Sequence, residues 1–228
     1  MSKEPEDLYL PKDILSNVAP RAIVTDLSKL HKPRKEQKMT AEQINEVSAE
    51  LYLTLVKNNG YGLSTTQIDS PWRACIVDIK EPLVLINPKI VKYGTVEEGK
   101  GERLVYIESC LSLPKTMDKP KRTMRYSHVV VKTDNLGILE FGPDSGTWKN
   151  NLFEDEGLLE SVCVQHEIDH LNGRIITDKE VQYNQQVTVD KIGRNEKVMI
   201  KSPDGNEMTY IKYKHAQPLI ENDGYTLV

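Results

Sequence analysis

The sequence has few cysteines, and they lie far apart. Only Cys75, Cys110 and Cys163 occur in 228 residues, and no two of them form a Cys-x-x-Cys pair. A sparse, odd number of cysteines argues against a disulfide framework and is typical of a reducing compartment. Each cysteine is therefore expected to belong either to a core or to a functional site.

Targeting and membrane segments are also missing. No apolar run approaches the roughly 18 residues that a membrane span needs. The N-terminal stretch MSKEPEDLYLPKD has neither the apolar centre of a signal peptide nor the arginine- and serine-rich bias of a transit peptide. These absences favour a cytoplasmic location. The formal net charge of −4 gives no reason to expect a nucleic-acid partner.

The remaining composition is that of a globular protein, with 38% hydrophobic and 28% charged residues. A first helix is predicted from Thr40, because the Thr40 hydroxyl can cap the Gln43 amide while the Gln43 side chain reaches back. Apolar residues follow at helical spacing, namely Ile44, Val47, Leu51 and Leu55. The helix is expected to end at Asn58-Asn59-Gly60, where asparagine and glycine tolerate left-handed dihedrals.

Short β-rich runs bounded by proline, glycine and aspartate predict strands at 73–79, 82–93 and 128–135. A hairpin is expected to join the last of these to residues 138–141. Residues 197–214 predict two further strands connected by a Pro-Asp-Gly turn, followed by a short polar segment. We see no chemistry in the region after residue 178.

The hydrophobic period becomes helical from Glu154 onward. The stretch EDEGLLESVCVQHEIDHL begins with acidic residues, is rich in helix formers and is followed by Gly173. One side of this second predicted helix collects the residues expected to face inward, which are Leu158, Leu159, Val162, Cys163, His166 and His170.

The motif QHEIDH on this helix predicts a metal site. Residues four apart on a helix lie about 40° apart around the axis and about 6 Å apart along it. His166 and His170 could therefore bind one ion, with Glu167 beside them to move protons on water. The alternative is a helix with two buried, hydrogen-bonded histidines.

A histidine pair supplies only two ligands, so the third must come from elsewhere. In the pattern HExxHxxGxxH the third histidine would occupy the position of Ile176, which excludes that pattern. Glu180 and Glu196 are carboxylates of a protease-like alternative, but they flank a region predicted as strand and loop. Cys163 lies about one turn from the expected ion and, like Cys75, is predicted to pack in the core.

Cys110 remains as a third ligand, in the stretch YIESCLSLP. Its neighbours Glu108, Ser109 and Ser112 are unusual around a purely structural cysteine. A thiolate with two imidazoles and an open fourth position is typical of a catalytic metal.

The loop NGYGLSTTQID offers further functional groups. Gly60 and Gly62 would allow the backbone to approach a ligand closely. Gln67 carries a neutral amide that suits a developing oxyanion. A plain surface loop is the alternative.

Together these three segments resemble the peptide deformylase family, whose blocks G-x-G-L-x-x-x-Q, E-G-C-L-S and Q-H-E-x-D-H occur in this order. Here the blocks stand at residues 60–67, 108–112 and 165–170. The resemblance implies an α+β fold with antiparallel sheets around the central HExxH helix. It places the catalytic domain at 1–178 and leaves 179–228 as a small β-rich extension of unknown role.

The resemblance also implies a reaction, namely hydrolysis of the N-formyl group from the initiator methionine of nascent polypeptides with release of formate. The implied ligands of one divalent ion, Fe²⁺ or else Zn²⁺ or Ni²⁺, are Cys110, His166 and His170. Glu167 would act as the general base. The Leu111 backbone N–H and the Gln67 amide would stabilise the oxyanion.

Further implied residues bind substrate or support the site. The backbone at Gly60 and Gly62 would pair with the substrate, close to Ser109, and Glu108 with Arg122 would brace the cysteine strand. The implied partners are N-formylmethionyl peptides, met at the ribosome exit, with no nucleic-acid or membrane partner. The expected state is a monomer in a bacterial cytoplasm, or a phage-encoded protein acting in a bacterial host.

Two positions depart from the family pattern. Ser109 stands where the family usually has glycine, and Met117 stands where many bacterial members have a substrate-contacting arginine. Both departures bear on peptide preference rather than on the chemistry. Two alternatives stay open, a HExxH metalloprotease with a carboxylate ligand from 179–228 and a binding protein without activity.

Overall fold

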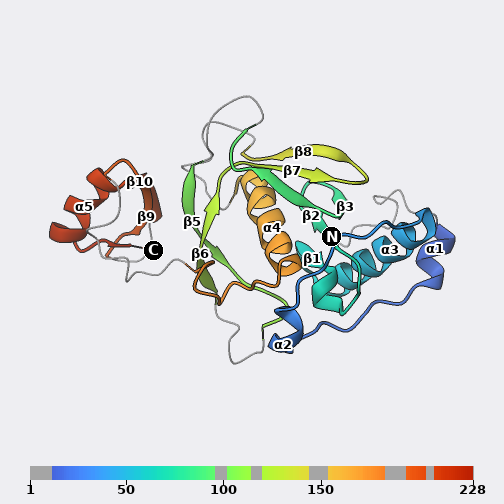
Figure 1. Cartoon of the computed structure of the whole chain (residues 1–228). Helices are drawn as coiled ribbons and strands as arrows, with labels where there is room; N and C mark the ends of the chain where they lie inside the picture. Colours follow the sequence, from blue (N-terminus) through green and yellow to red (C-terminus); the bar gives the residue numbers. More distant parts are fainter. Residues whose placement is uncertain are drawn as a thin grey trace.

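Helix α4 (Glu156–Leu171) lies at the centre of the molecule and is buried along most of its length. The computed structural model describes residues 12–95, 102–113, 120–143, 154–182, 194–203 and 208–227. Antiparallel sheets surround α4 within these ranges (Figure 1), so the predicted α+β fold with a central HExxH helix is confirmed. Among the described residues, no helix combines the length and the apolar character needed to cross a membrane.

Helix α3 (Ala41–Asn58) begins with the predicted capping box. The Gln43 amide donates to the Thr40 hydroxyl at 3.3 Å, and the Thr40 amide donates to Gln43 Oε1 at 2.9 Å. The helix ends at Asn59, whose φ of 52° is left-handed. Two shorter helices precede it, α1 (Lys12–Asn17) and α2 (Leu27–Leu30).

The first sheet leads directly into the candidate site. Strands β1 (Gly62–Ser64), β2 (Ala74–Asp78) and β3 (Pro82–Ile86) pair in this order, so β1 is an edge strand of the described sheet. A single 3-10 turn, η2 (Thr65–Ile68), follows β1 and packs against α4. The apolar face of α3 covers this sheet and forms one core cluster with it.

A second sheet contains β4 (Lys89–Lys92), β7 (Val129–Thr133) and β8 (Gly137–Phe141) in that order. The hairpin between β7 and β8 confirms the sequence prediction. The expectation of one strand over 82–93 is wrong, because β3 and β4 belong to different sheets.

Asn87 is the residue at which the chain changes sheets. Its φ of 49° is left-handed, which interrupts an extended strand. Its side-chain amide donates to the Gln37 carbonyl at 2.9 Å and to Asp134 Oδ2 at 2.6 Å. These long-range bonds hold the break in place, and local β propensity could not reveal them.

Strands β5 (Arg103–Glu108) and β6 (Lys121–Tyr126) form an antiparallel pair that the sequence did not predict as a hairpin. In Figure 1 this pair lies on one side of α4, opposite the sheets that contain β2 and β7. Helix α4 is therefore enclosed between sheets, and this explains why nearly all its side chains are buried.

The C-terminal region contains β9 (Lys197–Lys201), β10 (Met208–Lys212), α5 (Tyr213–Asn222) and β11 (Thr226–Leu227). Strands β9 and β10 pair as predicted, and β11 adds to the other edge of β9. Most of the predicted turn between β9 and β10 falls on residues 204–207, outside the described residues.

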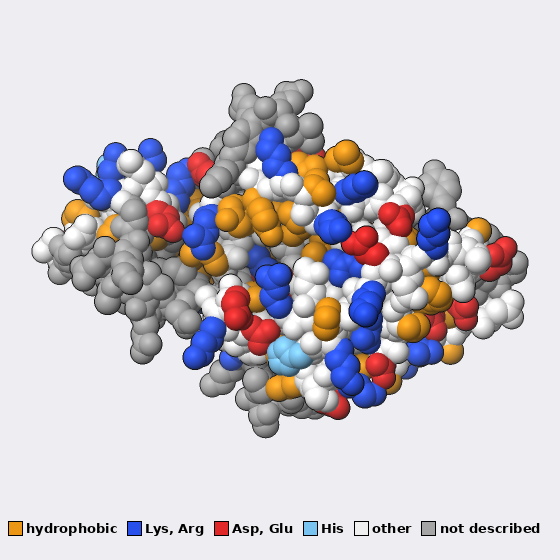
Figure 2. Space-filling model, viewed as in Figure 1, with side chains coloured by type: hydrophobic (Ala, Val, Ile, Leu, Met, Phe, Trp, Pro, Cys, Tyr) orange, Lys and Arg blue, Asp and Glu red, His pale blue; other side chains and the backbone are white. Residues whose placement is uncertain are grey.

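The helix α5 is a feature that we expected to be a polar segment, so the extension is not purely β. Its apolar residues do follow helical spacing, with Tyr213, Ala216, Leu219 and Ile220 packed on the β9 sheet. Pro218 inside the helix hid this signal, because proline is a strong indicator of irregular structure. On the face that Figure 2 shows, basic and acidic side chains are interspersed.

The capping box of α3 gives a first prediction. Replacing Thr40 by alanine removes the cap of the Gln43 amide and should lower the free energy of unfolding by about 1 kcal/mol. Thr40→Ser keeps a hydroxyl and should stay close to wild type. Chemical denaturation of both variants measures the difference, and equal stability of the two would contradict a role for the hydroxyl.

Candidate metal centre

Helix α4 presents both histidines from one side. Its N-terminus is capped by Asp155, whose carboxylate accepts from the Leu158 amide at 2.9 Å. His166 and His170 are four positions apart on this helix, and their Nε2 atoms lie 3.2 Å apart. Both rings are buried. The predicted pairing of the two histidines is therefore present in the structure.

Cys110 approaches this pair from the segment that follows β5. Its Sγ lies 3.2 Å from His170 Nε2, and the three potential ligand atoms all lie within 4.8 Å of one another. Neither Cys163, Glu180 nor Glu196 belongs to this group, which is the one such cluster among the described residues. A thiolate with two imidazoles suits Zn²⁺ and comparable divalent ions, so these residues fit the implied metal.

Glu108 determines the orientation of the first histidine. Its Oε2 lies 2.6 Å from His166 Nδ1, so a proton on Nδ1 leaves Nε2 free as a metal ligand. Burial by itself would raise the pKa of Glu108, but the charge of Arg125 and the bond to His166 outweigh it and hold the pKa well below its usual range. Glu108 is therefore a carboxylate.

Arg125 is the arginine that pairs with Glu108, whereas the sequence pointed to Arg122. Its Nε and Nη2 contact the two Glu108 oxygens at 2.6 and 3.0 Å, and its Nη1 reaches Asp169 Oδ2 at 2.5 Å. The physical reason is strand alternation. Arg122 lies opposite Ile107, on the other face of the β5–β6 pair, while Thr123 shares the face of Glu108 and bonds to it.

The importance of Arg125 could have been inferred from the strand period. Had residues 121–126 been predicted as a strand, every second residue would have shared a face, placing Thr123 and Arg125 together. Asp169 of α4 anchors the other side of the guanidinium.

Glu167 lies between the two histidines in sequence and faces a cavity of about 620 Å³. Its Oε2 is buried and has no hydrogen-bond partner among the described residues. Burial raises the pKa of Glu167 to about 7. A carboxylate that has one oxygen without a hydrogen-bond partner and a pKa near neutrality can both take up and return a proton.

Gly62 brings the β1 backbone against this carboxylate. A Cβ atom at Gly62 would lie 2.6 Å from Glu167 Oε1 and 2.5 Å from Cys163 Sγ, so there is no room for a side chain. The predicted close approach of the loop is therefore present at this residue. Cys163 packs in the core, as expected, with its sulfur at the wall of the cavity.

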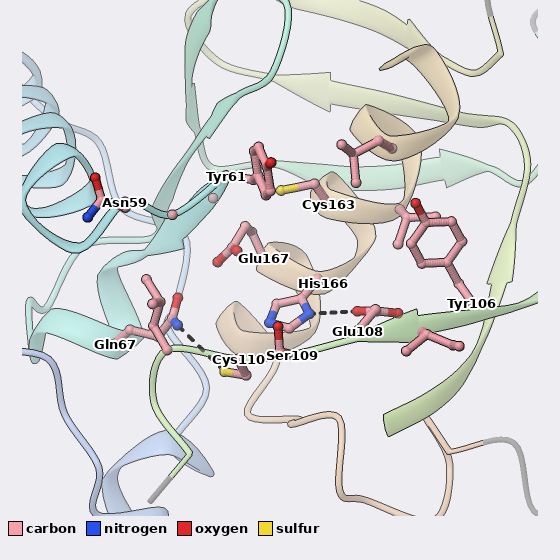
Figure 3. Close-up of a pocket in the computed structure, with 16 residues that line it drawn as sticks. Asn59, Tyr61, Gln67, Tyr106, Glu108, Ser109, Cys110, Cys163, His166 and Glu167 are labelled. Atoms are coloured by element: carbon pink, nitrogen blue, oxygen red, sulfur yellow. Dashed lines mark hydrogen bonds and ion pairs between the residues drawn. The ribbon is translucent and has the colours of Figure 1, made fainter. Parts of the chain in front are cut away.

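Gln67 directs its amide nitrogen toward the ligand cluster. Its Oε1 accepts from the Ser64 amide at 2.8 Å and from the Ser64 hydroxyl at 3.0 Å. This fixes the side chain so that Nε2 points toward Cys110 Sγ at 3.8 Å (Figure 3). The η2 turn thus presents an N–H donor beside the candidate ligands.

The cavity is lined by Gln67, Cys110, His166 and Glu167 together with the two segments 59–62 and 109–111. Ser109 and Leu111 line the cavity and are exposed, and Gly60 lies close to the Leu111 side chain. The predicted site residues therefore meet in one place, with Arg122 as the exception. Met117 lies outside the described residues.

Comparison with known proteins agrees with this arrangement. The sequence model of the family described as polypeptide deformylase matches residues 20–186. A peptide deformylase of Chromobacterium violaceum is 33% identical over 173 residues, which cover 74% of this chain and 91% of that one. A peptide deformylase of Dictyoglomus thermophilum is 36% identical over 152 residues, covering 66% of this chain and 85% of that one.

Solved structures show the same fold. The crystal structure of a peptide deformylase from Legionella pneumophila has a TM-score of 0.55 and 26% identity, covering 74% of this chain and 88% of that one. A plant peptide deformylase has a TM-score of 0.57 over 74% of this chain and 83% of its own, at 22% identity. The chain therefore belongs to the polypeptide deformylase family, the metal-dependent hydrolases that remove the N-formyl group from nascent polypeptides.

Proposed function

We propose that Cys110, His166 and His170 bind one divalent ion, Fe²⁺, and that Glu167 moves the protons of formyl hydrolysis. The observation that carries this proposal is the convergence of three ligand atoms within 4.8 Å beside a buried carboxylate oxygen without a partner. Zn²⁺ and Ni²⁺ suit the same ligands. Burial and the neighbouring His166 lower the pKa of His170, which favours the neutral ring that metal binding requires.

The ion, when bound, supplies a positive charge that acidifies water and polarises the formyl carbonyl. Glu167 takes a proton from the attacking water and later donates it to the leaving amine, so that the C–N bond breaks into formate and a free amine. Its position against Gly62 holds the carboxylate at the cavity wall.

Two N–H groups donate hydrogen bonds to the oxyanion that forms when water adds to the formyl carbon. The Gln67 Nε2 already points toward the ligand cluster, and its orientation is set by Ser64. The Leu111 backbone N–H follows Cys110 directly in the chain. Donors that are oriented before the reaction stabilise developing charge without reorganisation.

The substrate is an N-formylmethionyl peptide held along the outer edge of β1, which pairs with no other strand among the described residues. An extended peptide can pair with an edge strand through its backbone, which assigns this role to the segment of Gly60 and Gly62. Ser109 lines the opposite side of the entrance. The first side chain enters the apolar end of the cavity, formed by Tyr106, Leu159 and Val162 among others.

We place this activity on nascent chains at the ribosome exit, carried out by a monomer without nucleic-acid contacts of its own. The chain would act in a bacterial cytoplasm, or in a bacterial host if it is phage-encoded. Bacterial relatives support this setting, as does the fold shared with a probable peptide deformylase from a Synechococcus phage, which is 21% identical with a TM-score of 0.52.

The protease alternative loses its support at the third ligand. It needs an acidic ligand after residue 178, whereas the described ligand cluster contains Cys110 instead.

The alternative of an inactive binding protein is tested directly by formate release from formyl-Met-Ala-Ser with added Fe²⁺ under anaerobic conditions. Absence of formate with metal bound would favour that alternative.

The thiolate ligand gives a second prediction. Cys110→Ala should lose bound metal and formate release together, because two histidines alone hold the ion weakly. Cys75→Ala is the matched control, since Cys75 is a buried core cysteine outside the ligand cluster. Elemental analysis gives the metal content per chain, and an unchanged content in Cys110→Ala would disprove the ligand assignment.

The role of Glu167 gives a third prediction. Glu167→Ala should retain metal but lose about 10²–10⁴ in kcat, the usual contribution of a general acid–base group. Elemental analysis and a formate assay on the same preparation separate the two effects. A kcat equal to that of wild type would remove Glu167 from its assigned role.

The corrected ion pair gives a fourth prediction, with a built-in control. Arg125→Met should weaken metal binding by about 10- to 100-fold, because Glu108 loses the partner that holds it against His166. Arg122→Met changes a residue on the opposite face of the same strand and should leave metal affinity near wild type. Titration with Zn²⁺ compares the two, and a larger loss in the Arg122 variant would reverse the assignment.

A further inference from the structure

The sheet of the C-terminal region has two faces with different neighbours. Val198 and Ile200 of β9 pack with Tyr213 and Ala216 of α5, so α5 covers one face. Met199 lies between them in sequence and therefore points to the other face. That second face does not belong to the extension's own core.

Met199 and Tyr210 of this second face pack against the catalytic region. They are register partners in the β9–β10 pair, and both are buried. Both belong to one hydrophobic cluster with Tyr106 and Val162, from β5 and α4. In Figure 1 the β9–β10 sheet lies beside β5, with which β9 is in contact.

Polar contacts fix the position of the extension on β5. The Tyr210 hydroxyl donates to the Arg103 carbonyl at 3.2 Å. Lys197 Nζ contacts both Glu102 carboxylate oxygens, at 3.2 and 3.3 Å. Because these contacts come from both β9 and β10, they set the register of the sheet along β5 as well as its attachment.

The cluster that contains Met199 and Tyr210 also forms a wall of the substrate cavity. Four cavity-lining residues belong to it or pack on it, namely Tyr106, Ile107, Leu159 and Val162. In Figure 3, Tyr106 lies on the opposite side of the view from Gln67, with Glu167 and His166 between them. Met199 and Tyr210 are therefore placed behind the apolar end of the cavity, without lining it themselves.

We propose that Met199 and Tyr210 position this wall and thereby set which first side chain of a formyl peptide the cavity accepts. The identity of the substrate rests on the proposed function, whereas the packing of the wall does not. Protein interiors are close-packed, so removal of a supporting side chain leaves space into which the wall can retreat. The extension would then act as a positioning element for substrate selectivity.

The test is Met199→Ala in the full chain, with formyl-Met-Ala-Ser and formyl-Phe-Ala-Ser as substrates. A receding wall should raise KM for the methionine peptide, with kcat and metal content unchanged, and favour the larger ring. The ratio of kcat/KM for methionine over phenylalanine should fall about three- to tenfold, within the range for hydrophobic pockets. Met199→Leu, which conserves volume, should restore most of the ratio.

Ile200→Ala is the matched control. Ile200 is the next residue of β9, is fully buried and packs on the α5 face instead. It should lower the free energy of unfolding in the manner of Met199→Ala while leaving the selectivity ratio at its wild-type value. An equal change of the ratio in both variants would mean general loosening of the extension and would overturn the proposal.

A binding measurement separates this inference from the proposed function. In a Glu167→Gln background, calorimetry gives dissociation constants for both formyl peptides without turnover. If the wild type releases no formate, the proposed function is wrong. If Met199→Ala still shifts the ratio of the dissociation constants in that case, the role of Met199 in positioning the wall is supported. An unchanged ratio of the two dissociation constants in Met199→Ala overturns the role of Met199, whether or not the wild type releases formate.

Discussion

The buried ion pair between Glu108 and Arg125 joins three of the elements that build the site. Glu108 ends β5 two residues before Cys110, Arg125 belongs to β6, and its guanidinium also reaches Asp169 on α4. A buried carboxylate is costly unless its oxygens are satisfied. Both Glu108 oxygens are satisfied, and one of them also orients His166. The pair therefore determines where the cysteine meets the helix that carries the histidines.

The pKa values of the two carboxylates of the site shift in opposite directions, although burial by itself would raise both. Glu108 is surrounded by a guanidinium, a hydroxyl and an imidazole, so its pKa falls. Glu167 faces the cavity with one oxygen unpartnered among the described residues, so burial raises its pKa to about 7. One carboxylate is suited to hold a ligand in place and the other to exchange protons. Their environments, more than their sequence neighbours, distinguish these roles.

Residues after 178 pack directly against the catalytic region and share hydrophobic clusters with it. Val181 belongs to the cluster that contains Cys110, and its carbonyl accepts from the Met124 amide at 3.0 Å. Met199 and Tyr210 close the cluster behind the cavity. The family match ends at residue 186, beyond the division at 178 that the sequence suggested. The division at 178 stays a prediction, and residues before and after it pack in the same clusters.

The sequence by itself determined the features that depend on neighbours within one or two turns of chain. These include the capped helix that begins after Thr40, the histidine pair of α4 and the glycines beside Gln67, since spacing and capping are local. Even the distant Cys110 could be found, because the ligand chemistry required it. Only the tertiary structure decided that Arg125 rather than Arg122 supports Glu108, and that Met199 lies behind the cavity. Both depend on which face of a strand meets which partner, and strand register is set by contacts between distant segments.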